Sequence, residues 1–96
     1  MFLISLTLTA TADQIEPHNK AHGEWVRRYI TEGKFLLAGQ KKNSSGGVLL
    51  ATGLDAVELA RVLGEDSYVM ASLGSYEVTE CAIKLTQPWL EGLKAA

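Results

Sequence analysis

The sequence predicts an α+β domain built on one four-stranded antiparallel sheet. Its 96 residues suffice for a single domain, 1–96, with a modest core, and 47% of them are hydrophobic while 21% are charged. Segments with strand and helix periodicity follow in the order strand, helix, strand, strand, helix, strand. The simplest layout for that order places both helices on one sheet face, which is the ferredoxin-like βαββαβ arrangement.

Residues 2–9 are expected to form the first strand, because apolar residues occupy every second position along it. Of the alternate positions, Leu3 is apolar, while Ser5, Thr7 and Thr9 carry hydroxyl groups. A secretory signal would need a positive residue before the apolar run and a longer run, so we interpret this segment as a strand. No stretch of the sequence is long enough to span a membrane.

The first helix is expected to begin near Asp13 and to end at Glu32. Asp13 and Glu16 have the spacing of a capping box, although Pro17 could move the start toward Glu16. Gly33 would supply the left-handed residue that ends the helix.

One stripe of this helix is expected to face the core. Its members share the spacing of one helix face and are His22, Trp25, Val26, Tyr29 and Ile30. The stripe therefore places a titratable imidazole among apolar and aromatic side chains. Such a histidine is either a packed core residue or the working part of a pocket.

The second and third strands are expected at residues 34–42 and 47–52, joined by a hairpin-type connection. Asp55 and Glu58 form a second capping box, and the helix that they begin should end near Gly64. Asp66 has the position of an N-cap for a further short turn.

The last strand is expected at residues 75–85, followed by a short terminal helix or tail at 88–93. The single cysteine, Cys81, falls in this strand and cannot form an internal disulfide, so we expect a buried free thiol and a reducing, cytoplasmic environment. The net charge of −2, without a basic stripe, gives no electrostatic case for nucleic-acid binding.

One sheet face would remain uncovered if both helices pack on the other. The second and third strands are apolar on both faces, so that surface needs a cover. A second copy of the chain, packed sheet against sheet, is the simplest cover, and we expect a homodimer.

Several segments taken together resemble the YCII-related (YciI-like) proteins of the dimeric α+β barrel superfamily. The similarity runs over nearly the whole chain and rests on His22 and on four segments, which are residues 33–39 (GKFLLAG), 46–51 (GGVLLA), 65–68 (EDSY) and 76–78 (YEV). Two positions depart from the family pattern: Gln40 and Ser67 stand where proline is usual.

The resemblance implies a ferredoxin-like protomer whose sheet pairs with that of a second protomer into a barrel. It also implies a His–Asp pair in a cavity, at His22 and Asp66. Characterised relatives include a dehydrochlorinase of a chlorinated hydroxyquinol, and superfamily members include muconolactone isomerases. An imidazole oriented by a carboxylate is a general base or acid. We therefore expect a lyase- or isomerase-type proton transfer on a small cyclic or aromatic-derived molecule, with no cofactor.

Two simpler interpretations stay open for the pair. His22 could be a core histidine bonded to a backbone carbonyl, and Asp66 could be an N-cap alone, in which case the protein would be a non-catalytic binder or a structural dimer. His18, four residues before His22, has the spacing of a two-histidine metal site, but we expect no metal.

Four further side chains are candidates for the substrate pocket. Ser5 and Thr7 could direct hydroxyl groups into the barrel or into this pocket, and Tyr68 and Tyr76 could stack on a ligand or form hydrogen bonds with it. Each of these residues could equally be an ordinary strand or packing residue.

Overall fold

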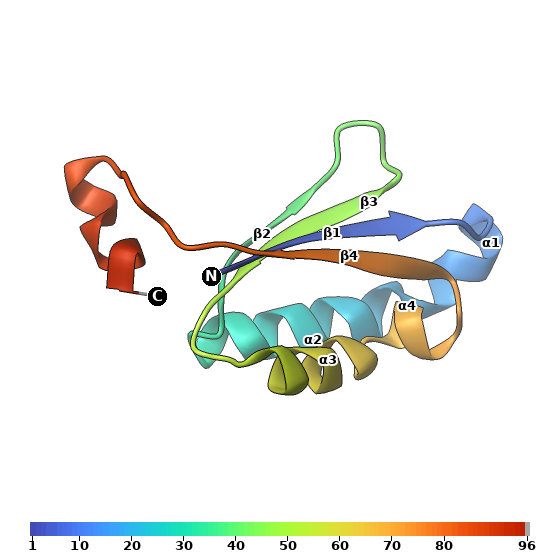
Figure 1. The fold of residues 1–96 in the computed structure, drawn as a ribbon. Coiled ribbons are helices and arrows are strands. Elements are labelled where there is room, and N and C mark those ends of the chain that lie inside the picture. Colours follow the sequence, from blue (N-terminus) through green and yellow to red (C-terminus); the bar gives the residue numbers. More distant parts are fainter. Residues whose placement is uncertain (96) are drawn as a thin grey trace.

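The chain folds as the predicted α+β domain, in a computed structural model that describes residues 1–95. Four antiparallel strands, β1 (Phe2–Leu8), β2 (Phe35–Gln40), β3 (Gly46–Ala51) and β4 (Gly74–Glu80), form one sheet in the order β2-β3-β1-β4. Figure 1 shows all the main helices on one side of this sheet. The ferredoxin-like prediction is therefore confirmed.

The register of the strands sorts their side chains onto two faces. Ile4 pairs with Leu49 on β3 and with Val78 on β4, and Leu6 pairs with Gly47 and Tyr76. Directly paired residues share a face, so these side chains point toward the helices. The core there is formed by Phe2, Ile4, Trp25, Tyr29, Phe35, Leu49, Ala51, Leu59, Val62 and Leu63.

The first helical segment differs from the prediction. It consists of a short helix α1 (Ala12–Ile15), a 3-10 turn η1 (Glu16–His18) and the main helix α2 (Asn19–Thr31). The capping box is made by Thr11 and Gln14, not by Asp13 and Glu16. Pro17 lies in the 3-10 turn, where its missing N–H interrupts α-helical bonding.

The end of α2 follows the prediction, while its inward stripe is narrower than expected. Gly33 adopts the positive φ of 77° that terminates the helix. Trp25 and Tyr29 are buried, but Ile30 remains 40% exposed, so the stripe ends before it. The indole of Trp25 donates a hydrogen bond to the Val62 carbonyl of the neighbouring helix at 3.0 Å.

The two helices that follow β3 begin at their predicted N-caps. Helix α3 (Ala56–Gly64) begins with the expected capping box of Asp55 and Glu58. The short helix α4 (Ser67–Met70) follows, with Asp66 as its N-cap. The segment that joins α3 to α4 therefore delivers Asp66 to the inner side of the helical layer.

The C-terminal region corrects two predictions. Strand β4 ends at Glu80, short of the predicted residue 85, and Cys81 is half-buried after it instead of buried within it. A final 3-10 segment, η2 (Pro88–Ala95), lies apart from the helical layer, as Figure 1 shows, and its Trp89 is 81% exposed. No helix among residues 1–95 is both long and apolar enough to cross a membrane.

The sheet face opposite the helices is apolar and uncovered in the protomer. Leu3, Leu37 and Val48 lie on it with 42%, 48% and 41% of their surfaces exposed, and Leu50 is half-buried among them. We call these four residues the outer sheet patch.

Candidate active site

His22 and Asp66 meet at the inner surface of the helical layer. Nδ1 of the imidazole lies 2.7 Å from Oδ1 of the carboxylate, across a separation of 44 positions in the chain. Asp66 is fully buried, whereas the His22 side chain keeps 22% of its surface exposed. A buried carboxylate next to a partly open imidazole holds the ring in one orientation and leaves its other nitrogen, Nε2, available.

Asp66 is held by donors from three elements. In addition to His22 from α2, its Oδ1 accepts a hydrogen bond from the Tyr68 backbone N–H at 3.2 Å, and its Oδ2 accepts one from the Tyr76 hydroxyl of β4 at 2.6 Å. A buried carboxylate needs such partners, because burying a charge without them is costly. Asp66 is therefore both the cap of α4 and the anchor of His22.

Tyr76 is a permanent donor to this carboxylate. Burial raises the pKa of its phenol far above the ordinary value, and the hydrogen bond to Asp66 raises it further. The hydroxyl therefore stays protonated over the whole physiological range of pH. Burial also raises the pKa of Tyr68, and the negative charge of Asp66 adds to the effect.

The imidazole also contacts two aromatic rings. The His22 and Tyr68 rings stack with centroids 4.1 Å apart and planes 16° from parallel. The Trp25 ring lies tilted to the imidazole, with a centroid distance of 5.7 Å. The Tyr68 hydroxyl donates to the Asn19 side chain, which ties α4 to the start of α2. Packing and hydrogen bonding thus fix the same ring position.

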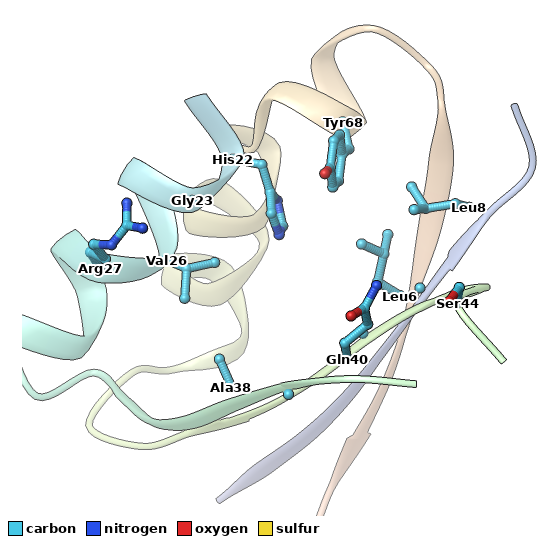
Figure 2. A pocket seen from close by; sticks show the side chains of 13 residues that line it. Leu6, Leu8, His22, Gly23, Val26, Arg27, Ala38, Gln40, Ser44 and Tyr68 are labelled. Carbon is cyan, nitrogen blue, oxygen red and sulfur yellow. The ribbon is translucent and has the colours of Figure 1, made fainter. Parts of the chain in front are cut away.

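A cavity of about 430 Å³ opens beside His22, between α2 and the β2–β3 end of the sheet. Figure 2 shows the imidazole pointing from α2 into this space, with Leu6, Ala38 and Gln40 on the opposite side. The volume lies in the range of small-molecule sites. A smaller recess of about 40 Å³ shares the walls at His22 and Val26 and reaches Tyr76.

Two glycines on opposite walls help to keep this cavity open. Gly23 lies on α2 and Gly47 on β3, where it pairs with Leu6 and Gln40 of the cavity lining. Neither residue places a side chain in the space between helix and sheet.

The four residues predicted as candidates for the substrate pocket fall into two groups. Tyr68 lines the main cavity and Tyr76 the smaller recess, so both lie at the predicted place. Ser5 and Thr7 do not. They pair with Val48 and Gly46 on the opposite sheet face, away from the cavity beside His22. The register explains this placement: with Ile4 and Leu6 on the inner face, the intervening hydroxyl groups point to the outer face of the sheet.

His18 has a different partner from His22. Its Nδ1 shares a hydrogen bond of 2.6 Å with the hydroxyl of Ser67, one residue after Asp66. Within residues 1–95 no three His, Cys, Asp or Glu side chains are grouped in a way that could hold a metal ion.

Sequence reasoning missed two polar residues of the cavity wall, Arg27 and Gln40. Helical spacing leaves Arg27 outside the predicted inward stripe, and Gln40 is distinguished in the sequence only by standing where the family usually has proline. The nearest signal in the sequence is Gly23, a poor helix former in the middle of a helix, since an isolated glycine there often has a packing or functional reason.

Comparisons with known proteins place the fold. No family model matches the sequence, and no curated protein matches it. The structure is similar to 5-chloro-2-hydroxyhydroquinone dehydrochlorinase from Burkholderia phenoliruptrix AC1100, solved in complex with 2,5-dihydroxybenzoquinone, with a TM-score of 0.68. The match covers 84% of this chain and 93% of that one at 14% identity. The chain therefore shares the fold of that enzyme.

Proposed function

We propose that this protein is a small enzyme of the YCII-related type that moves a proton on a small cyclic or aromatic-derived molecule. The observation that carries the proposal is the contact of 2.7 Å between His22 and a fully buried Asp66 at the wall of a ligand-sized cavity. A core histidine satisfied by a backbone carbonyl would need neither the buried carboxylate nor the cavity.

The geometry suits general acid–base catalysis. With its Nδ1 proton donated to Asp66, His22 presents Nε2 to accept a proton from a substrate carbon or hydroxyl. Asp66 stabilises the imidazolium that results. In an elimination the electron pair of the bond to the abstracted hydrogen forms the new double bond. The leaving group departs as an anion with the electron pair of its own bond. In an isomerisation His22 returns the proton to another atom of the substrate.

The fold neighbour supports the elimination variant. Its name states that it acts on a chlorinated hydroxyhydroquinone and that it was solved with a dihydroxybenzoquinone. A panel of halogenated and unhalogenated hydroxyquinols, assayed for halide release and for quinone absorbance, is therefore the first place to look for turnover.

The two histidines of the chain provide a matched test. His22→Ala should lower turnover by about 10²–10⁴-fold, the usual contribution of a general base, and added imidazole should restore part of it. His18→Ala, in the 3-10 turn η1 before α2 and outside the cavity lining, should retain turnover near that of the parent. Unchanged turnover in His22→Ala would show that the pair only packs, and a panel without any substrate would favour a non-catalytic binder.

The outer sheet patch supports a homodimer as part of the same proposal. Three of its side chains are more than 40% exposed, and an apolar surface of this kind on a regular sheet is suited to a self-complementary contact. The half-buried free thiol of Cys81 fits a reducing cytoplasmic location.

A further inference from the structure

We propose that Arg27, whose guanidinium lies over Gly23, forms an anion-binding subsite in the His22 cavity, and that the ligand is a ring compound carrying a carboxylate or similarly delocalised anion. The inference rests on the proposed ligand site but not on its catalytic activity. It names the chemical class that the cavity admits and the residue that selects it.

The side chains that line the cavity include a positive charge and no negative one. Its polar side chains belong to His22, Arg27, Gln40, Ser44 and Tyr68, and no aspartate or glutamate is among the residues that line it. Asp66 lies behind the imidazole and is fully buried. A small cavity with a fixed positive charge and no carboxylate on its surface favours an anionic ligand.

Arg27 differs in its pairing from the neighbouring arginine. Among residues 1–95, Arg28 pairs with Glu32 at 3.5 Å, whereas Arg27, like several of the lysines, has no ion-pair partner. Its guanidinium thus keeps its donors available, and their planar fork matches two oxygens that share a negative charge.

Gly23 explains how the guanidinium reaches the cavity. A Cβ built on Gly23 would lie 3.5 Å from Nη1 of Arg27, so the arginine lies back along the helix over the glycine. Gly23 adjoins His22 in the chain, and Figure 2 shows both His22 and Arg27 on the α2 wall of the cavity. An anion held by Arg27 therefore sits on the same wall as the candidate base.

A pair of ring compounds tests the subsite without requiring turnover. Gentisate carries a carboxylate at neutral pH, and gentisamide replaces it with a neutral group of similar shape. Binding of both to the parent protein and to Arg27→Gln would be measured by NMR titration. Arg28→Gln is the matched control. It removes the same charge from the next residue of the helix, an arginine that is already paired with Glu32.

We expect Arg27→Gln to weaken gentisate binding by about ten- to a hundredfold and to leave gentisamide binding unchanged. Arg28→Gln should change neither affinity by more than about twofold, apart from weak screening effects. An equal loss in both variants would show general charge attraction and overturn the subsite. Equal binding of acid and amide by the parent, or no saturable binding of gentisate at millimolar concentration, would also overturn it.

Gentisate titrations and turnover assays on the parent, His22→Ala and Arg27→Gln separate this inference from the proposed function. If the subsite exists and the chemistry does not, Arg27→Gln will lose gentisate affinity while neither the parent nor any variant turns over a compound of the panel. If the chemistry exists without the subsite, His22→Ala will lose turnover while Arg27→Gln binds gentisate as the parent does.

Discussion

Oδ1 of Asp66 accepts hydrogen bonds from both the imidazole of His22 and the backbone N–H of Tyr68, at 2.7 and 3.2 Å. One carboxylate oxygen therefore caps helix α4 and orients the candidate base. The second oxygen, Oδ2, accepts a hydrogen bond from the Tyr76 hydroxyl, so both carboxylate oxygens have donors. Helix capping and the proposed catalysis use the same oxygen atom. The two roles can therefore be distinguished only by a substitution that removes one of them and keeps the other.

Asp66→Asn should separate the two roles. Asparagine keeps an oxygen for the Tyr68 amide and is as good an N-cap as aspartate, so the free energy of unfolding should change by less than about 1 kcal/mol. The neutral amide stabilises an imidazolium far less than a carboxylate does, so turnover should fall by about 10²-fold or more. Urea unfolding and steady-state kinetics on the same preparation measure both quantities.

Asp66→Ala serves as the comparison for that variant. It removes the cap and leaves the donors of His22 and Tyr76 without an acceptor, which should cost about 2–4 kcal/mol of stability as well as the activity. Full turnover in Asp66→Asn would mean that Asp66 is a helix cap and nothing more.

Alkaline pH should destabilise the protein partly through Tyr76. The folded state raises the pKa of this phenol, whereas the unfolded chain ionises it near pH 10. Below about pH 10 both states hold the proton and stability is unaffected. Above it the unfolded state alone loses the proton, so the free energy of unfolding should fall by about 1.4 kcal/mol per pH unit from this residue.

Tyr76→Phe tests the assignment of that slope. The variant should lose about 1–3 kcal/mol at neutral pH, because Asp66 loses a donor, yet decline less steeply than the parent between about pH 10 and 11. Tyr29 and Tyr68 also have raised pKa values and remain in both proteins. Identical slopes for the two proteins would contradict the role given to Tyr76.

Gly23→Ala should stabilise the fold by about 0.5–1 kcal/mol. The residue lies inside α2 without a positive φ, and an added Cβ would meet Arg27 only at an ordinary contact distance of 3.5 Å. Gly33→Ala is the contrasting variant: it has open space but a φ of 77°, so it should destabilise by about 1 kcal/mol. Thermal unfolding of both variants measures the difference, and a less stable Gly23→Ala would show that the glycine is required for packing.

Val48→Glu should disrupt the proposed homodimer. Val48 lies in the outer sheet patch, where a charge would be buried against the second copy. Val57→Glu, on helix α3 and 80% exposed, is the control and should leave assembly unchanged. Light scattering coupled to size exclusion should report a dimer for the parent and for Val57→Glu, and a monomer for Val48→Glu. A monomeric parent at micromolar concentration would end the proposal.

Local patterns in the sequence predicted the elements of the fold and their order. Alternation identified β1, the capping box at Asp55 and Glu58 located α3, and Gly33 marked the end of α2. These signals work because caps and periodicity depend on neighbours within a few residues. The same reasoning predicts the wrong cap at Asp13, because Thr11 and Gln14 have the same capping-box spacing two residues earlier.

Local sequence patterns predicted only part of the candidate site. Periodicity placed His22 on the inner stripe of its helix, and N-cap chemistry placed Asp66 at the start of α4, but their pairing came from family resemblance. The hydroxyl groups of Ser5 and Thr7 were expected in the pocket and lie on the other sheet face.

What the sequence by itself determined is thus the set of elements, their caps and the residue types available for chemistry. Only the tertiary structure decided that Asp66 meets His22 across 44 positions, that Tyr76 completes the group and that Arg27 turns back over Gly23 into the cavity. The physical reason is that such meetings depend on sheet register and on how the helices pack against the sheet. Both are properties of the whole chain, and no local pattern encodes them.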